Sequence, residues 1–223
     1  MFAYPEKARY GRVIPKTKIF EKASVPSSVR KLFAAQVEKL VWEYKLAPDT
    51  VNLPERDGVL EIQVIITSLK TPDFDPALLR VLDRSIPHPV FFEIHTHGKA
   101  QTWAAYKRPH ATNPGEWVVG DYFSSPKRSL HAARSALPLA LDLYGLYESM
   151  LRSMMLPAKP GESLRAHVDR MSAFRVVQGE LRSLTSRLRR EKQFPLKVDL
   201  ERELRTLRKA WKLELEATDS GST

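Results

Sequence analysis

Apolar residues in the first part of the chain recur with two different spacings. Between Ser27 and Tyr44 they recur every three or four positions, the spacing of a helix that buries one face, and Pro48 marks the end of this segment. In residues 59–69 they alternate with polar residues, which is typical of a half-buried β-strand. The pattern therefore predicts a helix over 27–44 followed by a strand over 59–69.

The next hundred residues continue this mixture of helix and strand. The predicted elements are a short helix that begins at Asp75-Pro76, strands over 90–97, 100–107 and 116–123, and a helix that begins at Pro138. The first two of these strands are joined around Gly98-Lys99, which favours a hairpin. Residues 27–157 are thus expected to form a mixed α/β domain on a small sheet.

The last sixty residues have a helical spacing with one interruption. Apolar residues recur every three or four positions over 164–188, stop at Gln193-Phe194-Pro195 and resume over 200–211. Two amphipathic helices joined by a short turn predict an antiparallel coiled-coil hairpin over 161–217, and 218–223 is expected to be a flexible tail. The predicted fold class is α/β, of the mixed α+β kind, with this C-terminal helical hairpin.

The net charge is higher in the two ends of the chain than in its middle. The 223 residues carry 36 Lys and Arg against 26 Asp and Glu, a net charge of +10. The net charge is +4 in residues 1–25, +2 in 26–160 and +4 in 161–223. Such asymmetry favours a nucleic acid or another anionic partner, and a solvated basic surface is the alternative interpretation.

Residues 1–26 are predicted to form a basic arm. Arg9, Arg12, Lys16 and Lys18 lie close in sequence to aromatic residues, so the cations could hold phosphates while the rings stack on bases. Alternatively, the apolar residues pin this segment to the core and leave the charges in water. Both interpretations stay open at this stage.

Basic residues also cluster in three later segments. These are Lys107-Arg108, Lys127-Arg128, and Arg187 with Arg189-Arg190 and Lys192. On the hairpin, the pattern predicts a positive ridge along a phosphate backbone, formed by Arg182, Arg189, Lys192 and Arg208. The alternative is an ordinary coiled-coil exterior, on which nearby acids pair with these cations. The candidate nucleic-acid-binding residues are Arg9, Arg12, Lys16, Lys18, Lys107, Arg108, Arg189, Arg190 and Lys192.

Motifs for enzyme chemistry are weak in this chain. It has no cysteine, no phosphate-binding or dinucleotide-binding glycine loop, and no nucleophile elbow. His95 and His97 follow Glu93 at alternate positions, a spacing that metal sites use but that also occurs beside exposed turns. A metal-dependent nuclease built around Glu61 and Glu93, with Asp57, Gln63 and Lys99 nearby, is the enzymatic alternative. We expect no metal and no cofactor, and the sequence identifies no catalytic residue.

Several stretches spread over the chain resemble a bacterial family known as domain of unknown function 4391. They are Gly11-Arg12-Val13-Ile14-Pro15-Lys16, Val41-Trp42-Glu43-Tyr44-Lys45-Leu46-Ala47-Pro48 with Thr50, Asn52 and Leu53, Glu61-Ile62-Gln63, Asp83 with Ile86-Pro87, Ala105-Tyr106-Lys107-Arg108, and Glu191-Lys192-Gln193-Phe194 with Lys197-Val198. The resemblance implies a companion of helicases and DNA methyltransferases in restriction-like and antiphage gene islands. It implies no catalytic residue.

Together these observations predict a non-catalytic accessory subunit of a DNA-directed bacterial defence or restriction-modification system. Its hairpin is expected to bind a larger partner such as a helicase or methyltransferase, or a second copy in a homodimer. Its basic residues are expected to bind nucleic-acid phosphates without regard to sequence. No apolar run has the length of a membrane helix or of a secretory signal at the start, so we expect no membrane partner and a cytoplasmic location.

Overall fold

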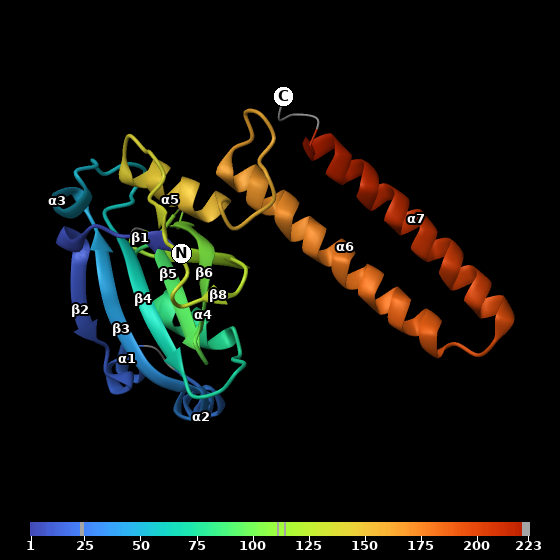
Figure 1. The fold of residues 1–223 in the computed structure, drawn as a ribbon, viewed down its shortest axis with the longest axis horizontal. Helices are drawn as coiled ribbons and strands as arrows, with labels where there is room; N and C mark the ends of the chain where they lie inside the picture. The colour runs from blue at the N-terminus through green and yellow to red at the C-terminus, as the bar shows by residue number, and fades with distance from the viewer. Residues whose placement is uncertain (23–24, 111, 114, 220–223) are drawn as a thin grey trace. The chain divides into compact units, whose positions relative to one another are not determined.

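The computed structural model describes residues 1–22, 25–110, 112–113 and 115–219, in two compact units (Figure 1). The first unit is Met1–Met154, and the second begins at Met155. Each unit is described by itself.

The first unit is built on a mainly antiparallel sheet whose strands follow the order β2-β3-β4-β5-β6-β7, with β8 paired to β6. The strands are β2 (Arg9–Val13), β3 (Val37–Leu46), β4 (Ile62–Leu69), β5 (Val90–Thr96), β6 (Lys99–Pro109), β7 (Trp117–Ser124) and β8 (Arg128–Ser129). Strands β4 and β5 are the parallel pair, and helix α4 (Ala77–Ser85) connects them. This arrangement confirms the mixed α/β class and the predicted strands at 59–69, 90–97, 100–107 and 116–123.

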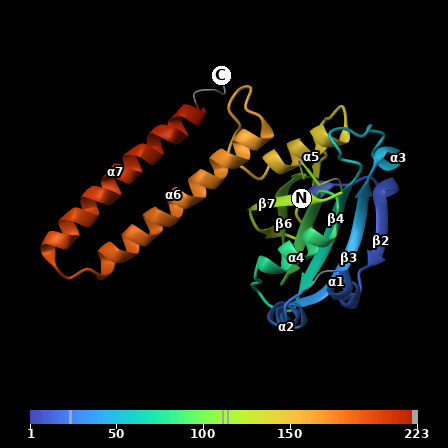
Figure 2. The ribbon, with the colours of Figure 1, turned by 180° about the vertical axis from the view of Figure 1, so that it is seen from behind.

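Helices cover one face of the sheet. Leu78, Leu79 and Leu82 of α4 and Phe33 of α2 (Ser27–Gln36) are buried in one cluster with Ile65, Phe92 and Ile94 of the sheet. Figure 2 shows α4 lying across the strands on this face. On the other face, Tyr147 of α5 (Leu143–Arg152) packs edge-on against Phe91, with ring centroids 6.2 Å apart. The remaining short elements of this unit are η1 (Glu6–Ala8), α1 (Lys16–Lys22), α3 (Pro48–Val51) and the parallel pair β1 (Phe2–Ala3) with β9 (Ser135–Ala136).

The helix predicted over 27–44 is wrong beyond Gln36. Helix α2 ends there, and β3 begins at Val37 and pairs with both β2 and β4. The register of β3 shifts twice, between Val37 and Lys39 and between Trp42 and Tyr44. Each bulge inserts one residue and breaks the alternation of a strand, so the apolar residues acquire the three- and four-residue spacing of a helix.

The helix predicted from Pro138 begins later, at Leu143. Asp142 caps it, because its Oδ1 accepts a hydrogen bond from the Gly145 N–H at 2.7 Å. Leu139 and Leu141, which precede this cap, are 100% and 90% exposed. Leu139 therefore does not belong to the buried helical face that the spacing predicted.

The second unit contains two long helices, α6 (Leu164–Arg190) and α7 (Phe194–Asp219). Leu184 of α6 is buried with Leu200 and Leu204 of α7, and Phe174 lies 4.7 Å from the ring of Trp211. Residues early in α6 thus meet residues late in α7, so the helices run in opposite directions (Figure 1). Thr218 and Asp219 end α7, and residues 220–223 of the predicted tail lie outside the described residues.

The predicted basic arm contributes to the first unit. Its residues form β1, η1, β2 and α1, and β2 is the strand next to β3 at one edge of the sheet. None of the described helices has the length and apolar composition that a membrane span requires.

Candidate nucleic-acid interface

Arg9, a candidate phosphate ligand on β2, is paired with acids. Its Nε donates to Glu43 Oε1 at 3.1 Å, and its Nη1 lies 3.4 Å from Glu6 Oε1. The hydrogen bond with Glu43 raises the pKa of the Arg9 guanidinium above its ordinary value. A phosphate would have to compete with two carboxylates for this side chain.

Lys107 is buried and has a structural role. Its Nζ donates to Asp83 Oδ1 at 3.0 Å and to the Ile86 carbonyl, and both side chains of this ion pair are 1% exposed. Tyr122 donates its hydroxyl to the second oxygen of Asp83 at 2.6 Å. Burial lowers the pKa of Lys107 and raises the pKa of Asp83. Because it lies inside the protein, Lys107 cannot reach a phosphate in solvent.

The other candidates of the first unit differ in accessibility. Lys16 is half-buried, donates to the Val37 carbonyl, and has its pKa lowered mainly by desolvation. Arg12 lies over the ring of Tyr10, 4.5 Å from its centroid. Within the described residues, the exposed Lys18 and the half-buried Arg108 form no ion pair or side-chain hydrogen bond.

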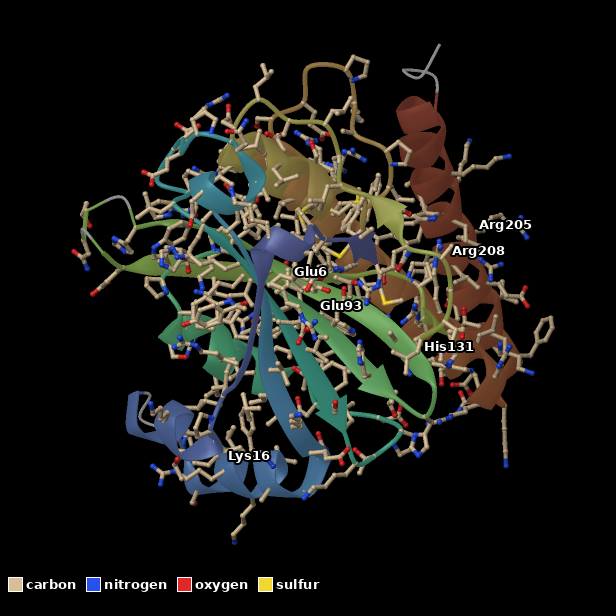
Figure 3. The ribbon with its side chains drawn as sticks, turned by 60° about the vertical axis from the view of Figure 1, so that its left-hand side comes forward. Glu6, Lys16, Glu93, His131, Arg205 and Arg208 are labelled. Atoms are coloured by element: carbon tan, nitrogen blue, oxygen red, sulfur yellow. The ribbon has the colours of Figure 1, made fainter. Side chains whose placement is uncertain are left out.

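The second unit has a groove lined by three arginines, which we call the basic groove. Arg182 and Arg189 reach it from α6 and Arg208 from α7, together with Leu181, Thr185 and Ser186, around a volume of about 430 Å³. None of its lining residues is acidic, and none of the three arginines has an ion pair or side-chain hydrogen bond within the described part of the chain. Arg182 and Arg189 are seven residues apart on α6, which is roughly 10 Å along one face of the helix. Figure 3 shows Arg208 and Arg205 on the same side of α7.

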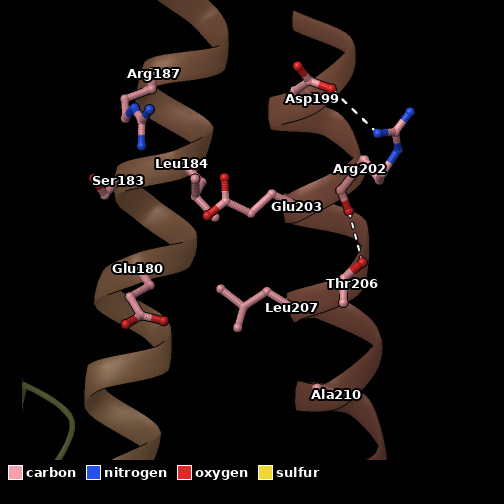
Figure 4. A pocket seen from close by; sticks show the side chains of 10 residues that line it. All are labelled: Glu180, Ser183, Leu184, Arg187, Asp199, Arg202, Glu203, Thr206, Leu207 and Ala210. Atoms are coloured by element: carbon pink, nitrogen blue, oxygen red, sulfur yellow. Dashed lines mark hydrogen bonds and ion pairs between the residues drawn. The ribbon is translucent and has the colours of Figure 1, made fainter. Parts of the chain in front are cut away.

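Another groove between the same helices, of about 710 Å³, has both signs of charge, and we call it the mixed groove (Figure 4). Its charged lining residues are Glu180, Arg187, Asp199, Arg202 and Glu203. Arg202 lies 3.5 Å from Asp199, and the side chains of Leu207 and Glu203 point from α7 towards α6. This side of the helix pair therefore matches the ordinary coiled-coil exterior that the sequence offered as an alternative.

The remaining two candidates of the second unit lie near its turn. Arg190 lines a smaller groove that it shares with Arg187 and with three acids, Glu191, Asp199 and Glu203. Lys192 is exposed in the segment between α6 and α7, where its backbone N–H donates to Glu191. Of the predicted ridge, Arg182, Arg189 and Arg208 line the basic groove, whereas Lys192 is not among its lining residues.

The two carboxylates of the nuclease hypothesis project from opposite faces of the sheet. Gln63 donates to Glu61, which therefore lies on the face of Gln63 and Ile65. Ile65 pairs with Phe92 on the neighbouring strand, so Glu93 points to the other face. Two side chains on opposite faces of a sheet cannot hold one metal ion.

Glu93 is buried (Figure 3) and forms an ion pair with the exposed Arg134. Both of its oxygens accept hydrogen bonds from Arg134 at 2.9 Å, and His95 Nε2 lies 3.5 Å from one of them. Burial acts to raise the pKa of Glu93, but the nearby His95 and the hydrogen bonds from Arg134 outweigh it, so its pKa lies below the ordinary value. His97 sits in the hairpin turn with a φ of 44°, and the described residues hold no cluster of three or more metal-ligating side chains.

The first unit also contains a cavity that the sequence pattern does not predict. It has a volume of about 440 Å³ and combines Tyr10, Arg12 and Lys18 with Trp42, Glu61, Gln63 and His88. The residues come from β2, α1, β3, β4 and the loop after α4, so short-range sequence patterns could not group them. Arg12 and Lys18 were singled out as cations, and the resemblance stretches include Trp42, Glu61 and Gln63.

The sequence of the chain matches the model of one protein family. The model of domain of unknown function 4391 (DUF4391) matches residues 2–210. The chain belongs to this family. The DUF4391 match spans both units, so it includes the basic groove as well as the cavity of the first unit. Searches of the curated proteins and of the solved structures returned no match.

Proposed function

We propose that this DUF4391 protein binds nucleic acid through the basic groove of its second unit, by contacts to phosphates and without reading sequence. The supporting observation is that Arg182, Arg189 and Arg208 line one groove with no acid among its lining residues in the described chain. Guanidinium groups bind phosphates in a forked geometry, and each neutralised phosphate releases counterions. The hydroxyl of Ser186 adds a hydrogen-bond donor to the same groove.

In this proposal the protein is a non-catalytic accessory subunit, and a larger protein occupies another side of the helix pair. The mixed groove supports this part, because residues of both signs allow complementary ion pairs with a protein surface. We infer that α6 and α7 form an antiparallel coiled coil around Leu184, Leu200 and Leu204. The family resemblance favours a helicase or DNA methyltransferase of a bacterial defence or restriction-modification system as that partner.

The test compares two triple variants that remove the same charge from different grooves. The basic-groove variant, Arg182→Ala, Arg189→Ala, Arg208→Ala, removes the three positive charges of the basic groove. The matched control, Arg187→Ala, Arg190→Ala, Arg202→Ala, removes three arginines from the grooves that also contain acids. Fluorescence anisotropy with labelled duplex DNA is recorded over a series of salt concentrations. We expect the basic-groove variant to lose about 0.9 per arginine from the slope of log K against log salt.

The control variant is expected to retain most of the slope and affinity, because its arginines share their grooves with acids. An equal loss in both variants would show that overall charge, and not the basic groove, attracts DNA. Wild-type binding that ignores salt would contradict the proposal as a whole.

A further inference from the structure

One wall of the cavity in the first unit brings three planar groups together. Tyr10 of β2 and Trp42 of β3 have ring centroids 4.4 Å apart with their planes tilted by 48°, and the guanidinium of Arg12 lies 4.5 Å from the centre of the Tyr10 ring. The register of the sheet places these groups side by side, because Arg12 is paired directly with Trp42 across the two strands. Aromatic and guanidinium planes in a cavity wall are surfaces on which a heterocyclic base stacks.

A second part of the cavity is polar and buried. Glu61 and Gln63 are 9% and 6% exposed; Gln63 donates its amide to Glu61, and Lys45 lies 3.1 Å from the second oxygen of Glu61. These contacts fix the carboxylate and the amide side by side. A carboxylate and an amide together offer acceptors and donors to the polar edge of a base.

His88 completes this polar part. Its Nδ1 is buried and has no hydrogen-bond partner within the described residues, while its Nε2 lies 3.7 Å from Glu61. Desolvation lowers the pKa of His88, so the neutral ring has one donor and one acceptor nitrogen. His88 lines the cavity next to Glu61, so its ring belongs to the polar lining that a ligand would meet.

Two cations complete the lining. Arg12 contributes a guanidinium, and Lys18 of α1 contributes an exposed ammonium group with no ion pair among the described side chains. Apolar residues such as Leu82 and Ile86 line the same cavity, whose volume of about 440 Å³ is typical of sites for small organic ligands. The cavity thus combines a stacking wall, a polar row and positive charge.

We propose that this cavity binds a nucleoside 5′-phosphate. The base stacks on the wall formed by Tyr10 and Trp42, its polar edge meets Glu61, Gln63 and His88, and its phosphate meets Arg12 and Lys18. The site is separate from the basic groove and does not depend on it. The ligand is either a free nucleotide or one unstacked nucleotide of a single strand, since both present the same groups.

Isothermal titration calorimetry with the four nucleoside 5′-monophosphates tests this assignment, with ribose 5-phosphate and inorganic phosphate as probes that lack a base. We expect at least one monophosphate to bind more than tenfold tighter than ribose 5-phosphate, since a base that stacks on an aromatic ring adds to the affinity. Arg12→Ala and Lys18→Ala are each expected to weaken binding about tenfold, as for a lost charged hydrogen bond. Lys31→Ala, an exposed lysine on α2 outside the cavity, is the matched control.

Trp42→Leu removes the stacking surface, and Trp42→Phe retains an aromatic ring. We expect Trp42→Leu to abolish base-dependent binding and Trp42→Phe to preserve part of it, with thermal unfolding confirming that both variants fold. Competition by a short oligothymidylate against the bound monophosphate assigns the ligand to a strand, and lack of competition assigns it to free nucleotides. Ribose 5-phosphate binding as tightly as every monophosphate would overturn the proposal.

The basic-groove triple variant separates this site from the proposed function. We expect it to bind the monophosphate as the wild type does, even though its affinity for duplex DNA falls. Loss of monophosphate binding in that variant would show that the monophosphate binds at α6 and α7, and it would overturn the assignment to the cavity.

Discussion

The two units use their basic residues in different ways. In the first unit, Arg9 pairs with two glutamates, and Lys107 is buried in an ion pair with Asp83. In the second unit, Arg182 and Arg208 face a groove whose described lining contains no acid. A count of basic residues therefore does not locate a phosphate site. What matters is whether the fold has already supplied each cation with a partner.

The strongest way to test this comparison is to remove Lys107. Lys107→Met leaves Asp83 buried without its counter-charge, so we expect the free energy of unfolding to fall by about 3–5 kcal/mol. Urea unfolding followed by circular dichroism measures the loss. The double variant Lys107→Met, Asp83→Leu is the control, and it should recover part of the stability because neither charge stays buried alone. A loss below about 0.5 kcal/mol in the single variant would show that Lys107 is not structural.

Glu162 and Arg170 provide the opposite case, a structural ion pair in the second unit. Both oxygens of Glu162 accept hydrogen bonds from Arg170 at 2.7 Å, and these bonds lower the pKa of Glu162 to about 2. An ordinary glutamate has a pKa of about 4.3 in the unfolded chain. The folded state therefore gains stability from this pair above about pH 4.3, and loses it as the pH falls towards 2.

We expect this loss to be about 1 kcal/mol, because solvent screens a pair near the surface and only part of the pKa difference becomes stability. Urea unfolding between pH 5 and pH 2 measures it, with Glu162→Gln as the matched variant that cannot titrate at this position. The difference between wild type and variant should shrink as the pH falls. A difference that stays constant with pH would contradict the role of the charge.

The sequence predicted the strands and α4 because their apolar residues follow the simple period of one element. It failed at β3, where bulges near Val37 and Trp42 imitate the spacing of a helix. It also could not distinguish Lys107 from Arg108, because burial against Asp83 depends on a helix more than twenty residues away in the chain. The helical pattern did place Arg182 and Arg189 on one face of α6, since residues seven apart share a face. The cavity of the first unit stayed hidden because its residues come together only through strand pairing.

The smallest expected effects come from Arg108 and Arg208. Both arginines lack an ion pair among the described residues, but they lie in different units. Arg108→Ala and Arg208→Ala should each change the free energy of unfolding by less than about 0.5 kcal/mol, since neither removes a buried partner. Arg208→Ala should lower the salt slope of duplex DNA binding by about 0.9, as expected when one phosphate contact is lost. Arg108→Ala should leave that slope unchanged, because Arg108 does not line the basic groove and its sequence neighbour Lys107 is buried and paired with Asp83. An equal drop in both variants would mean that free cations attract DNA wherever they lie, and that the grouping of arginines in the basic groove has no special part in binding.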